Sequence, residues 1–287
     1  MSRVAVPKLP AVPLGAHIPK IIHQTFRSHD LPDELRANVA AMKAMNPGWE
    51  HRLYDDADIE AFIRQSYGNE ILAYYHRIDP RYGAARADLF RYLLLYRVGG
   101  VYLDIKSTTV RPLDEMLRPD DVYLLSHWGN HAGGPRAGWG MHGEIEATGR
   151  GEYQQWHVIC APGHPFLKAV IEQVLQNIHG YRPWRQKLGQ HAVLQVTGPI
   201  AYTKAILPIR HLHPHRLVQD DREIGVEYSI FPGVTHNRLF TNHYVPLQRP
   251  MIATTGLVWC WTQVYLAARW VRNKAVEMRR ARAAPQA

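Results

Sequence analysis

The segment at residues 84–108, AARADLFRYLLLYRVGGVYLDIKST, constrains the fold of this chain more than any other. Residues 84–97 are nearly all apolar and long enough for a helix that is buried on most sides. Gly99 and Gly100 then lead the chain into a short strand at Val101–Ile105. A buried helix joined directly to a short strand predicts an open α/β sheet.

This segment also places charges where an apolar core is expected. Asp88 and Arg91 lie about 60° apart on a helix, so they share one face. Burying such a pair is costly unless a partner or a ligand satisfies it. Asp104 ends the strand and Lys106 follows two residues later. Open α/β sheets bind ligands at the carboxyl ends of their strands, so this charged end predicts either a ligand site or an internal ion pair that orients the helix.

The rest of the chain predicts alternating strands and helices. Turn residues and periodicity indicate strands near 18–25, 49–54, 122–126 and 156–161, and helices near 31–45, 57–65 and 165–179. Asp30 is the expected cap of the first helix. From residue 180 to the last helix we expect short strands and loops. The alternation predicts an α/β fold, a Rossmann-like domain with a mostly parallel central sheet and helices on both faces.

Composition limits the class of protein. An apolar fraction of 46% is ample for one folded core in 287 residues. Cys160 and Cys260 lie a hundred residues apart and cannot form a disulfide framework, which favours a reducing compartment. We expect three parts: an extended, mobile arm at 1–17, one domain at 18–250, and an amphipathic basic helix at 251–287.

The net charge of +9 is compatible with phosphorylated ligands, anionic lipid or nucleic acid. Much of it follows the apolar, aromatic stretch GLVWCWTQVYLAARWV at residues 256–271. That stretch is shorter than the about 20 apolar residues of a membrane span. It predicts either a helix packed on the domain or an interfacial helix, 256–282, on an anionic membrane. The expected location is the cytoplasm, peripheral on the inner face of the plasma membrane.

Five motifs together resemble a known family. They are IPKIIHQTF (18–26), NPGWEHRLYDD (46–56), ADLFRYLLLYRVGGVYLDIK (87–106), APGHPFL (161–167) and TGP (197–199). In this order they are similar to the DXD-motif glycosyltransferases of family 32, which include the fungal initiating mannosyltransferases, and distantly to the glucosylating bacterial toxins. The resemblance implies a GT-A fold that binds a nucleotide-sugar.

The resemblance also implies roles for individual residues. Asp88 and Arg91 match the residues that hold the donor sugar, and Asp104 matches the first Asp of the DXD motif, which contacts ribose and metal. The implied catalytic set is Asp88, Arg91, Asp104 and Lys106. The implied donor-binding set is His23, Gln24, Thr25, Asp88, Arg91, Tyr102 and Asp104.

The chain departs from the family at Lys106, which stands where the second Asp of DXD is expected. Two interpretations remain open. Asp104 and a later residue such as His243 or Asn242 bind Mn²⁺ or Mg²⁺ while Lys106 reaches the diphosphate. Alternatively, Lys106 replaces the metal by neutralising the leaving group itself.

The leading hypothesis is a retaining glycosyltransferase that moves a hexose or N-acetylhexosamine from a nucleotide-sugar to a saccharide or lipid-linked acceptor, in surface polysaccharide or glycolipid synthesis. Exposed Trp128 and Trp139, in a long loop at 127–154, are candidates for the acceptor side. The alternatives are a metal-dependent hydrolase and a basic nucleic-acid-binding protein. Since no nucleic-acid-binding signature is present, we expect no nucleic-acid partner.

Overall fold

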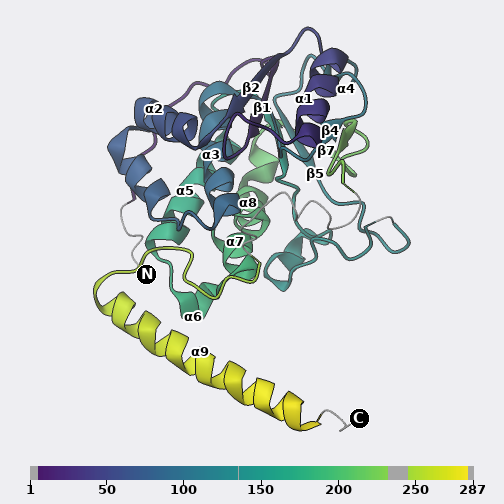
Figure 1. The fold of residues 1–287 in the computed structure, drawn as a ribbon. Helices are drawn as coiled ribbons and strands as arrows, with labels where there is room; N and C mark the ends of the chain where they lie inside the picture. Colours follow the sequence, from purple (N-terminus) through teal and green to yellow (C-terminus); the bar gives the residue numbers. More distant parts are fainter. Residues whose placement is uncertain (1–5, 135, 232–244, 284–287) are drawn as a thin grey trace.

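A computed structural model describes residues 6–134, 136–231 and 245–283, with side chains to residue 278 (Figure 1). Its central sheet has six strands in the order β2-β1-β3-β6-β5-β7. In chain order these strands are β1 (Ile21–Thr25), β2 (Glu50–Tyr54), β3 (Gly100–Leu103), β5 (Tyr123–Ser126), β6 (His157–Cys160) and β7 (Arg216–Val218). A separate two-stranded sheet pairs β4 (Thr108–Thr109) with β8 (Val226–Glu227).

The central sheet is parallel except for β6. The pairs β1–β2, β1–β3 and β5–β7 are parallel, whereas β6 runs antiparallel to both β3 and β5. The predicted α/β class with a mostly parallel central sheet is therefore confirmed. The first residue of this reversed strand, His157, pairs with the last residue of β3, Leu103. The segment that leads into β6 therefore lies at the carboxyl end of β3.

Helices cover both faces of the sheet (Figure 1). One face packs against α2 (Asp56–His76), α3 (Gly83–Val98), α5 (Pro165–His179), α7 (Gln190–Val196) and α8 (Pro199–Ile206). The other face is covered by α1 (Asp33–Met45) and α4 (Leu113–Met116). Strand β3 shows the alternation that divides the two cores, because Tyr102 packs on the first side and Val101 and Leu103 on the second.

The N-terminal segment is extended, as expected, but it is docked on the domain. Val6, Leu9 and Val12 pack against the larger core cluster. The Gly15 N–H donates a hydrogen bond of 2.9 Å to the carbonyl of Pro162. These contacts hold residues 6–15 against the domain in the structure, and the mobility of the arm stays a prediction.

Three sequence-based expectations were wrong or incomplete. Helix α1 has Pro32 at its N-cap with no side-chain cap, so Asp30 does not cap it. Helix α2 is interrupted at Gly68, whose φ of 77° and ψ of 179° are not helical: the expected helix near 57–65 matches the part before Gly68, and the helical part after it was not expected. Beyond residue 180 the chain forms helices rather than only strands and loops: α6 (Pro183–Gln186), α7, α8 and the 3-10 helix η2 (Leu207–Leu212). These helices are short, and three of them carry Pro in the first turn, where its missing N–H costs no helical hydrogen bond.

The last helix, α9 (Gly256–Ala283), lies along the end of the domain near α6 and extends past it (Figure 1). It begins five residues later than the expected boundary at 251. Met251 and Ile252 are instead fully buried in the domain, where Ile252 pairs with Ile78. No helix in the described ranges is both long enough and apolar enough to cross a bilayer.

The Gly100 backbone gives a first prediction. Gly100 has φ 106°, and a Cβ there would lie 2.7 Å from the Ile21 carbonyl oxygen and 3.0 Å from His23 Nε2. We expect Gly100→Ala to lower the free energy of unfolding by about 3 kcal/mol, from backbone strain and overpacking together. Urea unfolding measures it. The control Gly149→Ala has a similar φ, 69°, with open space around it, and should cost about 1 kcal/mol. Equal losses for the two variants would contradict a steric role for Gly100.

Candidate functional site at the carboxyl edge of β3

The candidate site lies where β1 and β3 end and β6 begins. Thr25 ends β1, and Asp104 directly follows β3. Because β6 is antiparallel, its approach, Gln155 and Trp156, reaches the same edge. The Asp104 N–H donates to the Trp156 carbonyl at 2.9 Å, which fixes the acidic end of β3 against this approach.

Arg91 of α3 is the centre of the site. Its Nη2 donates to Asp104 Oδ1 at 3.0 Å and lies 3.3 Å from Asp88 Oδ1. Its Nη1 donates to the carbonyl oxygen and to Oε1 of Gln155 at 2.5 and 2.7 Å. The guanidinium carbon stands 4.6 Å from the centre of the Tyr102 ring. Burial by itself lowers the pKa of Arg91, but Tyr102, Asp104 and Asp88 raise it above its ordinary value, so the cation is permanent.

Asp88 is buried one turn before Arg91. Its Oδ2 accepts from the Thr197 hydroxyl at 2.9 Å, and its Oδ1 accepts from Gln155 Nε2 at 3.2 Å. Burial raises the pKa of Asp88, while Arg91 opposes that shift. These two hydrogen bonds engage both carboxylate oxygens and fix the position of Asp88. Because its Oδ1 also lies beside Arg91 Nη2, Asp88 helps to hold the guanidinium in place.

Asp104 is the exposed member of the set. Its side chain keeps 26% of its surface accessible, against 4% for Arg91 and 3% for Asp88. A carboxylate that is held through one oxygen and still reaches solvent is arranged to contact a ligand.

Lys106 is buried beside this carboxylate with a neutral partner. Its Nζ donates to the Tyr228 hydroxyl at 2.8 Å and lies 3.9 Å from the centre of that ring. Burial lowers the pKa of Lys106; Asp104 opposes the shift and Arg91 adds to it. Within the described residues Lys106 forms no ion pair, so an incoming anion would find a poorly compensated cation.

His23 and Gln24 lie behind the exposed carboxylate. The neutral His23 ring donates from Nε2 to the Gly99 carbonyl at 3.1 Å and accepts at Nδ1 from the Tyr54 hydroxyl at 3.0 Å. Burial lowers the pKa of His23 to about 3. Gln24 is equally buried and donates to the Asp104 carbonyl at 3.3 Å. Both side chains are occupied by the protein in this conformation, and their donor-binding roles stay predictions.

Thr25 and Tyr102 form the next layer. The Thr25 and Tyr102 hydroxyls are 3.0 Å apart and share a hydrogen bond. Tyr102 is buried beneath Arg91, which gives it a supporting position. Of the predicted donor-binding residues, Thr25 and Asp104 are the two that are partly exposed at the surface.

Sequence reasoning missed three residues of this site. Gln155 bridges Asp88 and Arg91, yet only the reversal of β6, which the sequence does not signal, brings it there. Tyr228 comes from a loop segment with no motif. Thr197 could have been found, because it lies in the TGP motif that we quoted only for its resemblance.

Asp104 could bind a divalent cation only as one ligand of several, with further ligands from the substrate. Mg²⁺ is commonly held by one or two carboxylates together with substrate phosphates, and Asp104 offers such an oxygen. Among the described residues, a group of three ligands within 4.8 Å occurs only at His29, Asp55 and Asp58, where the two carboxylates already cap α2. The other predicted ligand, His243, lies with Asn242 outside the described residues.

The long loop at 127–154 differs from the expectation of two exposed tryptophans. Trp128 is buried, and its Nε1 donates to Glu152 at 2.7 Å, whereas Trp139 is half exposed. Trp128, Trp139 and Trp156 all pack around the ring of Tyr228, the partner of Lys106. The loop therefore reaches the site through Tyr228.

These features define an α/β domain with a charged ligand site at the carboxyl edge of its parallel strands. Residues 32–123 match the family described as "Glycosyltransferase sugar-binding region containing DXD motif". The match includes Asp88, Arg91, Asp104 and Lys106. The resemblance to the DXD glycosyltransferases is thus confirmed over this part of the chain.

Curated relatives agree with this resemblance. The initiation-specific alpha-1,6-mannosyltransferase of Schizosaccharomyces pombe is 26% identical, over 68% of this chain and 50% of its own length. Inositol phosphoceramide mannosyltransferase 3 of the same organism is 35% identical, over 36% of this chain and 28% of its own. The chain thus spans about half or less of the length of these relatives. Among solved structures, PaToxG glycosyltransferase is similar with a TM-score of 0.45 at 15% identity, over 69% of this chain and 71% of that one.

Because Arg91 is buried and Asp104 is partly exposed, we expect their substitutions to lower the free energy of unfolding by different amounts. Arg91→Met leaves Asp88 buried without its cation, so we expect the free energy of unfolding to fall by about 3–5 kcal/mol. Asp104→Asn changes a partly exposed group and should cost about 1 kcal/mol or less. Urea denaturation of both variants measures the difference. A stable Arg91→Met protein would contradict the central position of Arg91.

Proposed function

We propose that this chain is a retaining glycosyltransferase. It transfers a hexose or N-acetylhexosamine from a nucleotide-diphospho-sugar to a saccharide or lipid-linked acceptor, in the synthesis of a surface polysaccharide or glycolipid at the cytoplasmic side of a membrane. One observation carries the proposal: the Asp104 carboxylate, held by Arg91, is partly exposed at the carboxyl edge of β3 within the matched sugar-binding region.

In the proposed complex the donor lies across the end of β3. Asp104 contacts the donor ribose, and Thr25 lies at the end of the adjacent strand. Asp88 and Arg91 keep the family role of holding the donor sugar, and their mutual bonds keep this edge rigid. Catalysis then rests on positioning and on charge stabilisation of the leaving group, without a strong protein base.

The transfer step requires compensation of negative charge. The acceptor oxygen bonds to the anomeric carbon on the face from which the diphosphate departs. The bond from that carbon to the phosphate oxygen breaks, and the leaving diphosphate keeps the electron pair and takes the acceptor proton. Lys106, a buried cation with only a neutral hydrogen-bond partner, is placed to compensate the charge of this diphosphate.

A divalent cation, Mn²⁺ or Mg²⁺, remains part of the proposal. Asp104 would be its protein ligand among the described residues, and the cation would add positive charge at the diphosphate. Lys106 limits this site, because an ammonium close to a metal ion repels it.

The relatives' names guide the choice of substrates. Two kinds of relative are named as mannosyltransferases, one initiation-specific and one acting on inositol phosphoceramide. A panel of UDP- and GDP-sugars that includes GDP-mannose therefore tests the donor, and lipid-linked and saccharide acceptors test the second substrate.

Donor hydrolysis and thermal stabilisation test the proposal directly. We expect one nucleotide-sugar to raise the melting temperature and to be slowly hydrolysed, because a ligand that binds the folded state stabilises it. Asp104→Asn should abolish both effects and keep the fold. Cleavage of unrelated esters that survives Asp104→Asn would instead support the metal-dependent hydrolase.

Lys106 and the cation are separated by a second experiment. Lys106→Met should lower kcat about 10²–10³-fold, the usual effect of removing one group that stabilises a developing anion. Lys168→Met, at an exposed lysine of α5, is the matched control.

A strong chelator should also lower turnover of the unmodified protein, with recovery on addition of Mn²⁺ or Mg²⁺. Turnover that is undiminished by the chelator would contradict the metal and leave Lys106 as the source of positive charge.

A further inference from the structure

Helix α9 turns an apolar face away from the domain. Seven residues recur at alternating steps of four and three, the spacing of one helical face. They are Leu257, Trp261, Val264, Ala268, Val271, Ala275 and Met278. Leu257 is 80% exposed and Trp261 62% exposed, and Val264, Val271 and Met278 are also exposed. Trp259 and Trp270, eleven residues apart, are also exposed, but at 100° per residue they lie on the other side of the helix from this row.

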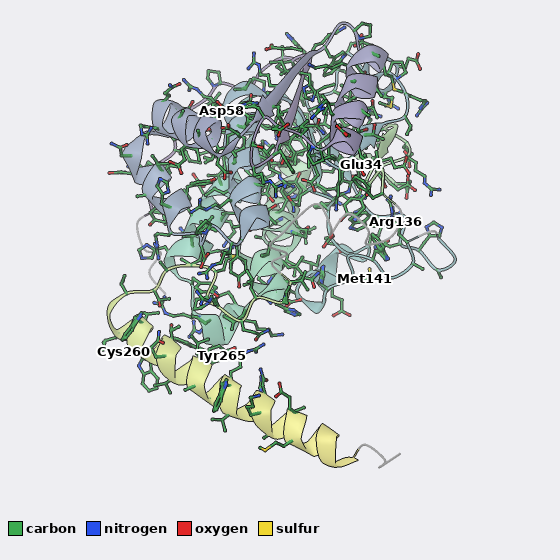
Figure 2. All side chains as sticks on the ribbon, in the orientation of Figure 1. Glu34, Asp58, Arg136, Met141, Cys260 and Tyr265 are labelled. Atoms are coloured by element: carbon green, nitrogen blue, oxygen red, sulfur yellow. The ribbon has the colours of Figure 1, made fainter. Side chains whose placement is uncertain are left out.

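The opposite side of α9 is already used by the domain. Thr262 is buried, and Val258, Tyr265 and Leu266 are partly buried. Arg269 donates from Nε to Gln248 Oε1 at 3.0 Å. A cavity of about 370 Å³ between α9 and α6 is lined by Trp184 and Tyr265 and by two residues of the apolar row, Trp261 and Val264. The outer face is therefore the part of the helix that the domain leaves uncovered. Figure 2 labels two residues of this helix, Cys260 and Tyr265.

The charge of α9 favours one kind of partner. Its residues include six basic ones and a single acidic one, Glu277. Arg272 and Lys274 are exposed and lie on either flank of the apolar row. Basic side chains beside an apolar face match an anionic lipid surface, where the apolar groups enter the boundary and the cations meet headgroups.

We propose that the outer face of α9 binds the surface of an anionic bilayer, so that the helix lies in the plane of the interface and the domain sits above it. A second copy of the helix would also cover the apolar row, but it would bring two basic helices together. Like charges at that distance repel, whereas an anionic surface attracts both the basic flanks and the apolar row. Membrane binding does not depend on the proposed reaction, since α9 contributes no residue to the site at β3.

Vesicle flotation of the full chain tests the proposal. We expect binding to phosphatidylcholine vesicles that contain phosphatidylserine, and weak binding to phosphatidylcholine alone. Binding should weaken at about 1 M salt, because the screening length falls to about 3 Å. The double variant Arg272→Gln/Lys274→Gln should reduce the partition coefficient roughly thirtyfold, since each basic residue near an anionic surface contributes about fivefold.

A second pair of variants separates the apolar face from general surface effects. Val264→Glu/Val271→Glu should abolish flotation, and Leu212→Glu, at an apolar side chain of 61% exposure on η2, should leave it unchanged. Circular dichroism and the melting temperature of every variant show whether the domain is folded, independently of any donor.

Cys260 provides a direct readout. It is exposed near the outer face of α9, while the other cysteine, Cys160, is buried in the core. An environment-sensitive dye on Cys260 should shift to the blue on anionic vesicles. No binding to anionic vesicles at low salt would overturn the proposal. So would a dimer, measured by light scattering, that Val264→Glu/Val271→Glu converts to monomer, because the face would then join two copies.

Discussion

The buried Arg91 cation must be neutralised by its surroundings, and this requirement fixes how the elements around the site are arranged. Arg91 stands inside an otherwise apolar helix, and a permanent positive charge there is tolerated only with carboxylates and carbonyl oxygens around it. Three separate elements supply them: α3 itself through Asp88, the end of β3 through Asp104, and the approach to β6 through Gln155. The position of the exposed carboxylate is therefore fixed by a requirement of the core.

The reversed strand β6 makes this compensation geometrically possible. In a fully parallel sheet the residues before β6 would lie at the opposite edge from Asp104. Running antiparallel, β6 brings Gln155 to Arg91 and lets the Trp156 carbonyl hold the Asp104 backbone. The orientation of the Gln155 amide follows from its neighbours: Oε1 accepts from Arg91 and Tyr92, and Nε2 donates to Asp88. Both ends of the Gln155 amide thus face a partner of the opposite kind.

Local patterns predicted the centre of the fold and the charged residues at the site. The apolar helix, the two glycines and the short strand all occur within two residues of their expected places. Sequence alone did not predict the partners of Asp88 and Arg91, because Thr197 and Gln155 are 109 and 64 residues away from them and meet them only in the folded sheet. The short helices after residue 180 were missed for a related reason, since elements of four to eight residues depend on tertiary packing more than on local periodicity.

Lys106 shows how the departure from the DXD motif is accommodated. Its ammonium lies in a partly apolar environment, and Tyr228 supplies a hydroxyl acceptor and the negative face of an aromatic ring without supplying a charge. Tyr228 is in turn packed between Trp128, Trp139 and Trp156, so the partner of Lys106 is held from both sides. A buried aspartate at position 106 would be stabilised by a nearby cation, whereas the buried lysine is stabilised by a nearby anion. A lysine at this position therefore favours a negatively charged group nearby, which is consistent with the diphosphate of the proposed donor.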